Sequence, residues 1–293
     1  MTAARRRGLS LVEMVISIAL IGTIAVMATP LLRLPLAAWG DASRRADLTQ
    51  AAAAVHSQLA QDLQRALPGS VRRRALGGRE VLEMLEVRAE GRYRSGTGGA
   101  GVCPVACAAP ASRDALQLGC TDACFTSLGL LEGDPPVGGS DWVVVLGGAA
   151  PDPYLGGNVA VPGGVKTRLT DVAAAPEGQR VRHGAHNFVA GSAERRFYIV
   201  STPITWDCNP AARTLRRLSG YPVTAVQALA PVGATSNVVV SDIVSACQWL
   251  LQPGTGAIGS TLLARLQLER SAPGATQPER LEHVAQFALA PRR

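Results

Sequence analysis

The chain has 293 residues, of which 47% are hydrophobic, so it can bury a sizeable core and a wholly disordered chain is excluded. Its 31 glycines and 19 prolines are too many for a helical bundle, and they concentrate after Leu67, which favours a β-rich body behind a helical N-terminal part. The net charge is +7, but no basic run alternates with aromatic residues, so nucleic-acid binding is not expected.

The N-terminus combines a short basic head with a long apolar run. Residues 1–8 read MTAARRRG, and residues 9–32 contain Glu13 as their only charge. About 20 helical residues span the hydrocarbon core of a bilayer, so this run is long enough to cross a membrane. The arginines of the head place the N-terminus in the cytoplasm by the positive-inside rule, and we therefore expect the rest of the chain to be exported.

Two ordinary alternatives exist for this segment. A secretory signal peptide needs a small-residue cleavage site after its apolar region, and Met27-Ala28-Thr29 fits only loosely because the apolar run continues past it. An uncleaved signal anchor fits the length better. It does not explain Glu13, because an unpaired carboxylate inside an apolar helix costs about 2–4 kcal/mol.

The segment Gly8–Met14, GLSLVEM, resembles the type IV prepilin motif, in which glycine precedes the cut and glutamate is the fifth mature residue. The resemblance implies that a prepilin peptidase cleaves between Gly8 and Leu9 and that the new amine of Leu9 is methylated, although the family usually has Phe there. It implies that Glu13 neutralises that amine on a neighbouring subunit, since an unpaired charge in a dry environment is costly. Pro30 stands where these pilins carry a helix-kinking proline.

The apolar helix is expected to continue as an amphipathic spine. Apolar residues recur at spacings of three or four, at Leu48, Ala52, Val55, Leu59, Leu63 and Ala66. Leu67-Pro68-Gly69 then supplies a stop signal. The alternative is a separate soluble helix after Pro35 and Gly40.

The chain is thus divided into four parts. These are the leader 1–8, a transmembrane and assembly helix 9–36, the amphipathic continuation 37–68, and an exported β-rich domain 69–293. In the last part, strands are predicted at Val81–Val87, Trp142–Leu146, Arg196–Val200, Ile204–Cys208, Thr214–Leu218, Val238–Ile243, Leu262–Arg270 and Glu282–Leu289. Residues 94–140 and 147–192 are rich in Gly, Ala and Pro and are predicted to be long loops. The predicted fold is α+β and type IV pilin-like, with the long helix packed on one antiparallel sheet.

Short motifs of the exported part are similar to MshO-type minor pilins of the mannose-sensitive haemagglutinin (MSHA) pilus system. They lie at Ala66–Arg72, Leu82–Val87, Gly91–Arg94, Arg196–Val200, Leu215–Arg217, Gly220–Pro222, Val244–Cys247 and Pro253–Gly256. The glycine-rich stretch that carries four cysteines matches least. The resemblance implies a non-catalytic minor subunit that helps to initiate, prime or tip a filament.

All six cysteines lie beyond the apolar segment, which suggests an oxidising compartment and disulfides. They are Cys103, Cys107, Cys120, Cys124, Cys208 and Cys247. The first four form two pairs with three-residue gaps and could instead hold zinc, although zinc sites more often use two-residue gaps or histidines. Three connectivities are open among these four. Cys208 and Cys247 lie on two predicted strands and form the best candidate for a single bridge.

Other candidate chemistry is sparse. His183 and His186 have the spacing of a metal pair, but they lie in a predicted Gly-rich loop without a nearby carboxylate, so a solvated loop is favoured. Arg72-Arg73-Arg74 is predicted to be a solvated loop as well. The carboxylates Glu80, Glu83, Glu86 and Glu90 are assigned mostly to the wet side of a strand. No catalytic set stands out, and no cofactor or metal is expected.

The leading functional hypothesis is therefore a minor pilin. Its expected partners are other pilins through the N-terminal helix, the prepilin peptidase, the inner-membrane assembly platform and membrane lipid. It would cross the inner membrane once, with a periplasmic body, and then enter a filament or its tip. A pseudopilin of a type II secretion system and a membrane-anchored exported enzyme are the alternatives. The neighbouring genes would distinguish a minor pilin from a pseudopilin. Mass spectrometry of the mature N-terminus would distinguish a minor pilin from a membrane-anchored enzyme.

Overall fold

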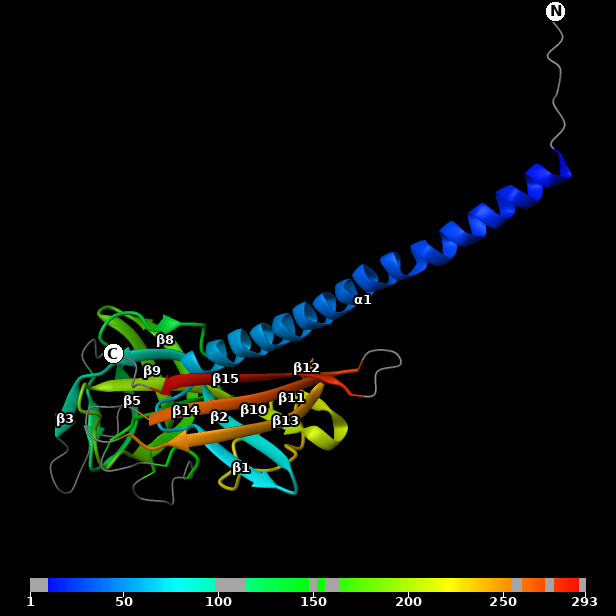
Figure 1. Cartoon of the computed structure of the whole chain (residues 1–293). Helices are drawn as coiled ribbons and strands as arrows, with labels where there is room; N and C mark the ends of the chain where they lie inside the picture. The colour runs from blue at the N-terminus through cyan, green and yellow to red at the C-terminus, as the bar shows by residue number, and fades with distance from the viewer. Residues whose placement is uncertain are drawn as a thin grey trace, which may run out of the picture.

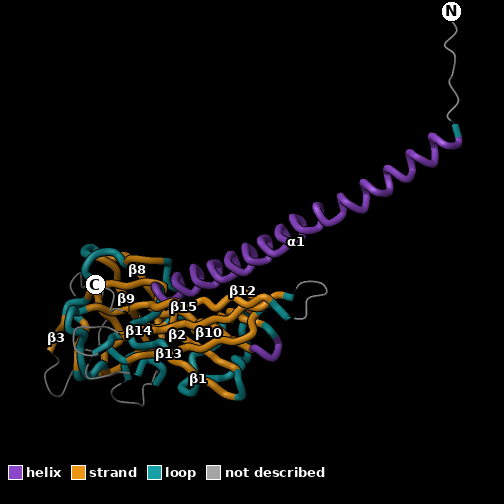
Figure 2. Tube along the Cα trace, viewed as in Figure 1, coloured by secondary structure: helices purple, strands orange, loops and turns teal. Residues whose placement is uncertain are grey.

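A single long helix leads into a body of strands. The computed structural model describes residues 10–97, 114–147, 152–155, 164–254, 260–271 and 277–289. The N-terminal half of the helix, α1 (Leu11–Gln64), stands clear of the body, whereas its C-terminal half lies along the strands (Figures 1 and 2). A helix followed by antiparallel sheets is the predicted α+β architecture, and this prediction is confirmed.

The C-terminal half of α1 buries one apolar stripe against the body. Leu48, Ala52, Val55 and Leu59 are at most 4% exposed, as their spacing of three or four residues predicts. Because α1 runs unbroken from Leu11 to Gln64, the alternative of a separate soluble helix is wrong.

The helix ends at Gln64, before the predicted stop at residues 67–69. At this point the backbone begins to pair with a strand: the N–H of Leu67 donates to the carbonyl of Leu85 in β2 (Arg79–Arg92) at 2.8 Å. A sheet hydrogen bond thus takes the place of a helical one, which the local sequence does not reveal.

The larger of the sheets has ten strands, and all of its pairs are antiparallel. Its main path is β1-β2-β10-β7-β8-β9-β5, while β11 and β12 extend it from β10 and β6 pairs with β2. Besides β2, its strands are β1 (Arg72–Leu76), β5 (Thr121–Thr126), β6 (Glu132–Gly133), β7 (Trp142–Val144), β8 (Lys166–Ala175), β9 (Gly178–Asn187), β10 (Arg196–Asn209), β11 (Thr214–Ser219) and β12 (Ser236–Ser241). A separate parallel pair joins β3 (Ser95–Thr97) to β4 (Leu116–Leu118).

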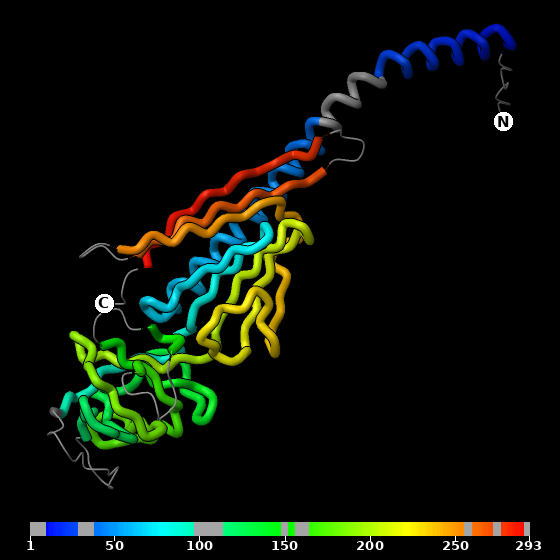
Figure 3. The backbone as a smooth tube through the Cα atoms, turned by 90° about the horizontal axis from the view of Figure 1, so that it is seen from below, coloured from blue at the N-terminus to red at the C-terminus, as the bar shows by residue number. Residues whose placement is uncertain are grey.

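A second antiparallel sheet has the order β13 (Val244–Gln252), β14 (Ser260–Arg270), β15 (Glu279–Leu289). It runs along the C-terminal half of α1, as Figure 3 shows in orange and red. One core joins α1 to both sheets, with Trp206 of β10 and Trp249 of β13 both almost fully buried. The predicted single sheet is therefore wrong, because alternation identifies strands but not which strands pair.

Parts of both predicted loop regions are regular strands. The described residues of 94–140 contain β3 to β6, and those of 147–192 contain the long hairpin β8–β9. The loop prediction is wrong there because few of these residues are large and apolar. The strands are held by cross-strand pairs such as Val172 with Val181 and by a second core around Phe125.

The predicted hairpin between β10 and β11 is confirmed. Its turn is the short 3₁₀ helix Pro210–Ala212, in which the N–H of Ala212 donates to the side chain of Asn209 at 3.3 Å. Arg213 closes the turn in a left-handed conformation, with φ of 57°.

Candidate functional site

The most distinctive surface of the molecule is the N-terminal half of α1. The segment Leu11–Ala28 is apolar, and none of it is buried against the rest of the described chain. At about 1.5 Å per residue it is roughly 27 Å long, close to the thickness of a bilayer's hydrocarbon core. Leu11 is 80% exposed and Ile21 66%, so this surface lacks a partner within the described part of the subunit.

Glu13 lies in the first helical turn of this exposed segment. A carboxylate at that end interacts favourably with the helix dipole. The backbone carbonyl of Glu13 accepts a hydrogen bond from the Ser17 hydroxyl at 2.7 Å. Among the described residues, no cation forms an ion pair with Glu13, so its carboxylate is available to a group outside this subunit.

The other predicted assembly residues are only partly visible. Gly8 and Leu9 lie outside the described residues. The helical backbone of α1 passes through Pro30, whose side chain is not described. Cleavage after Gly8, methylation of Leu9 and a kink at Pro30 therefore stay predictions.

Residues 3–29 match the family described as the prokaryotic N-terminal methylation motif. These residues carry the motif that type IV pilins and pseudopilins share. The matched residues include Gly8, Leu9 and Glu13, so the motif implies processing by a prepilin peptidase and an association with pilus or secretion machinery. The exposed helix is of the kind that anchors such a prepilin-like protein in the inner membrane. No curated protein and no solved structure matches the chain.

A disulfide between Cys208 and Cys247 joins the two larger sheets. Cys208 lies on β10 and is fully buried, Cys247 lies on β13, and their Cα atoms are 6.5 Å apart. That distance lies within the normal range for a disulfide. The bridge ties the three-stranded sheet to the large sheet.

The other four cysteines are described only in part. Cys120 and Cys124 are both in disulfides, whereas Cys103 and Cys107 lie outside the described residues. Zinc requires thiolate ligands, so the zinc alternative fails for Cys120 and Cys124. The pairing among these four stays open.

His183 and His186 do not lie in a solvated loop. Both are on β9, with 4% and 3% of their surface exposed. His183 Nδ1 lies 2.9 Å from the carbonyl oxygen of Gly184, and His186 Nε2 lies 2.7 Å from that of Gly164. Burial lowers the pKa of His183. The loop prediction is wrong because the Gly-rich sequence of β9 does not reveal that this segment pairs with other strands.

Asp62 was not expected to matter, yet it attaches α1 to the large sheet. Its carboxylate, on a residue 6% exposed, accepts a hydrogen bond from Trp206 Nε1 at 2.8 Å. Arg217 of β11 donates to it twice, at 2.7 and 2.9 Å. The hydrogen bond to Asp62 raises the pKa of Arg217. One sequence feature could have indicated this role: Asp62 is a carboxylate three positions after Leu59, within the apolar stripe of the helix.

Glu83 also departs from its predicted place on the wet side of β2. It is 1% exposed and pairs with Arg72 at 2.7 Å. Burial raises its pKa. Arg72 lies on β1, not in a loop, and its guanidinium carbon stacks 3.4 Å from the centre of the Tyr154 ring. The Tyr154 hydroxyl in turn donates to the carbonyl of Ser70 at 2.8 Å. This cluster therefore links Tyr154 to the segment that follows α1.

Lys166, the single lysine of the chain, is another buried charge. Its Nζ donates to the carbonyls of Pro153 and Tyr154, each at 2.9 Å. It also lies 5.4 Å from the centre of the Trp142 ring. Burial lowers its pKa to about 8. These contacts fasten residues 152–155 to β8.

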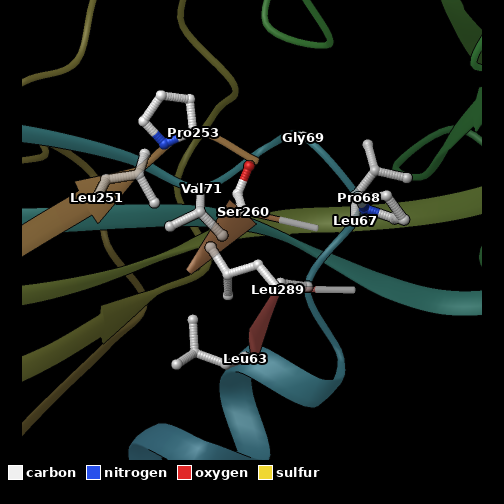
Figure 4. A pocket seen from close by; sticks show the side chains of 10 residues that line it. Leu63, Leu67, Pro68, Gly69, Val71, Leu251, Pro253, Ser260 and Leu289 are labelled. Atoms are coloured by element: carbon white, nitrogen blue, oxygen red, sulfur yellow. The ribbon is translucent and has the colours of Figure 1, made fainter. Parts of the chain in front are cut away.

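A hollow of ≈ 240 Å³ lies where α1 ends, between the Leu67–Gly69 turn and the three-stranded sheet. Figure 4 shows aliphatic side chains around it, including Leu63, Val71 and Leu289, with Ser260 as the lining hydroxyl. One hydroxyl among aliphatic groups does not make a nucleophile and base pair.

Proposed function

We propose that the chain is a non-catalytic minor pilin that helps to initiate, prime or tip a type IV pilus of the MSHA kind. One observation carries the proposal: the helix with the methylation motif exposes an apolar surface, bearing a single carboxylate, that none of the described residues covers. A membrane covers it before assembly, and other pilin helices cover it in the filament. The folded body then sits on the periplasmic side or on the filament surface.

The body supports a minor rather than a major role. Its ten-stranded and three-stranded sheets make a large body, which favours a minor subunit over the repeated one, and the MshO-like motifs favour the MSHA assignment. The same helix also supports a pseudopilin of a type II secretion system. Deleting the gene and scoring pilus number against protein secretion separates the two functions.

Gly8→Leu is expected to leave the leader attached in cells that contain a prepilin peptidase, because glycine is the residue that precedes the cut in the matched motif. Intact-mass spectrometry checks this result. Wild-type protein should begin at a methylated Leu9, and Gly8→Leu should begin at Met1 or Thr2. Gly22→Leu is the matched control, since a Cβ at Gly22 meets nothing within 4 Å, and it should be processed normally. A wild-type chain that keeps its first eight residues contradicts the proposal.

Glu13→Ala is expected to leave membrane insertion and the body intact while reducing filament incorporation by about tenfold or more. Such a loss corresponds to roughly 1.4 kcal/mol, below the cost of unpairing a buried charge. Immunoblotting of sheared filaments against the membrane fraction measures it. Ser17→Ala, which lies one turn further along the same exposed face, is the control and should incorporate normally. Normal incorporation of Glu13→Ala removes the proposed pairing with a neighbouring amine.

A further inference from the structure

Strand β12 forms an open edge of the large sheet. It pairs with β11 on one side, and no other described strand pairs with its second side. A strand in this position directs every second backbone N–H and C=O group away from its partner, where the groups bind water or another strand. The edge is therefore a hydrogen-bonding surface made of backbone.

β12 lacks the features that usually protect such an edge. Natural edge strands carry charged side chains or proline, or another element covers them. The sequence of β12 is SNVVVS, with neither charge nor proline, and the one register shift in its pairing lies beyond Val239, toward Ser241. Val238 and Val239 are 48% and 50% exposed, although they point to opposite faces of the sheet. The middle of β12 thus presents apolar side chains on both faces beside an open backbone edge.

The chain that leads into β12 is uncharged over a long stretch. Residues 218–241 contain no Asp, Glu, Lys or Arg, whereas 17% of the whole chain is charged. In the connection between β11 and β12, Val226 is 75% exposed and Val232 89%. Charged residues are depleted in the cores of protein interfaces, and exposed apolar surface marks interaction sites. This composition fits an uncharged protein partner.

The position of β12 places it within reach of a neighbouring subunit. The strand lies against α1. In Figure 1 it is labelled at the end of the body from which the projecting half of α1 leaves. A subunit that packs along the exposed apolar half of α1 therefore passes close to β12, and the helix and the strand edge belong to one side of the molecule.

We propose that β12 binds an extended, uncharged segment of a different pilin-like subunit, which adds a strand to the large sheet. The proposal rests on the proposed function, because that function supplies the neighbouring subunit. In strand addition the backbone hydrogen bonds provide affinity, and the side chains on alternate positions provide specificity. The valines of β12 select apolar side chains on the added strand.

A second copy of this chain is a poor partner for the same edge. Two β12 strands that pair symmetrically run antiparallel, because a twofold axis relates them. The C-terminal half of α1 lies along the strands, so the two helices would then point in opposite directions (Figure 1). Their apolar halves could not enter the same membrane, and the partner is therefore a different subunit.

Photocrosslinking in intact cells tests the partner. The full chain carries p-benzoylphenylalanine in place of Val239 or, as a control, in place of Val284, a valine of β15 that is 49% exposed. The probe at 239 should join the chain to another protein with the methylation motif, at an extended apolar segment that mass spectrometry of the crosslinked peptides identifies. The probe at 284 should not give this product. No crosslink from 239, or a crosslink to a second copy or to a protein without the motif, overturns the proposal.

A charge at the edge tests whether the added strand matters for assembly. Val239→Lys should lower incorporation into sheared filaments by about tenfold or more, because the added strand would bury an unpaired charge. Val239→Thr stays uncharged and β-branched and should incorporate normally, as should Val284→Lys. The denaturant midpoint of the purified chain should be unchanged in all three variants, since both positions are half exposed. Normal incorporation of Val239→Lys overturns the proposal.

The two experiments also separate this proposal from the pilus function. A wild-type chain that is absent from filaments contradicts the pilus function, yet the crosslink from 239 in the membrane fraction still supports strand addition. A wild-type chain that enters filaments without that crosslink, and equally well with Val239→Lys, supports the pilus function and overturns strand addition at β12.

Discussion

The double variant Cys208→Ala, Cys247→Ala is expected to lose about 3–4 kcal/mol of the free energy of unfolding. The two residues are 39 positions apart, and their disulfide restricts the unfolded chain over that whole loop. In the folded state the bridge also ties β13 to β10, so its loss should loosen the three-stranded sheet from the large sheet. Both cysteines are replaced because a single replacement at Cys247 would leave Cys208 as an unpaired thiol in the core.

Denaturant unfolding of the mature chain in detergent, followed by tryptophan fluorescence, measures this loss. Reduction of the wild type serves as a comparison, and reduction of the double variant shows how much the other disulfides contribute. In the single variant Cys208→Ala, Cys247 should react as a free thiol. A double variant within 1 kcal/mol of the wild type, or peptide mapping that joins Cys208 to another cysteine, contradicts the expectation.

Asp62→Ala is expected to destabilise the body by about 3–5 kcal/mol, the range for breaking a buried ion pair on one side. The variant leaves the Arg217 guanidinium and the Trp206 N–H without the carboxylate to which both now donate. Trp206 is fully buried, so water cannot readily replace the lost acceptor. Asp62→Asn should cost less, because one side-chain acceptor is kept.

Asp47→Ala is the matched control on the same helix. Asp47 pairs with Arg270 at 2.8 Å, but both side chains are 48% exposed, and such pairs contribute about 0–1 kcal/mol. The same denaturant experiment compares the two variants, and a shift of Trp206 emission is expected for Asp62→Ala alone. Equal losses in the two variants would show that Asp62 is not the main polar attachment between α1 and the large sheet.

The local sequence was enough to predict the elements that depend on interactions between residues close together in the chain. The apolar run around Glu13 defines a membrane-length helix, because helical hydrogen bonds are satisfied within the segment itself. The spacing of Leu48, Val55 and Leu59 defines the buried stripe of the spine. The turn residues at 209–213 define a hairpin, since their preferences act over a few positions.

Only the tertiary structure decided which segments pair when they are far apart in the sequence. The predicted loops contain β8 and β9, whose few apolar residues give no clear alternation until Val172 faces Val181. The second sheet follows from which strands share hydrogen bonds, and a strand's own sequence does not encode its partner.

By itself the sequence determined that this chain has an apolar N-terminal helix with the prokaryotic methylation motif and an α+β body. The tertiary structure decided which polar residues are buried, because burial depends on what the rest of the chain places around them. Asp62, Glu83 and His183 look like surface residues from their neighbours in sequence, yet each is almost fully buried. A buried polar group must find its partner in space, and Asp62 finds Trp206 and Arg217 on strands far along the chain.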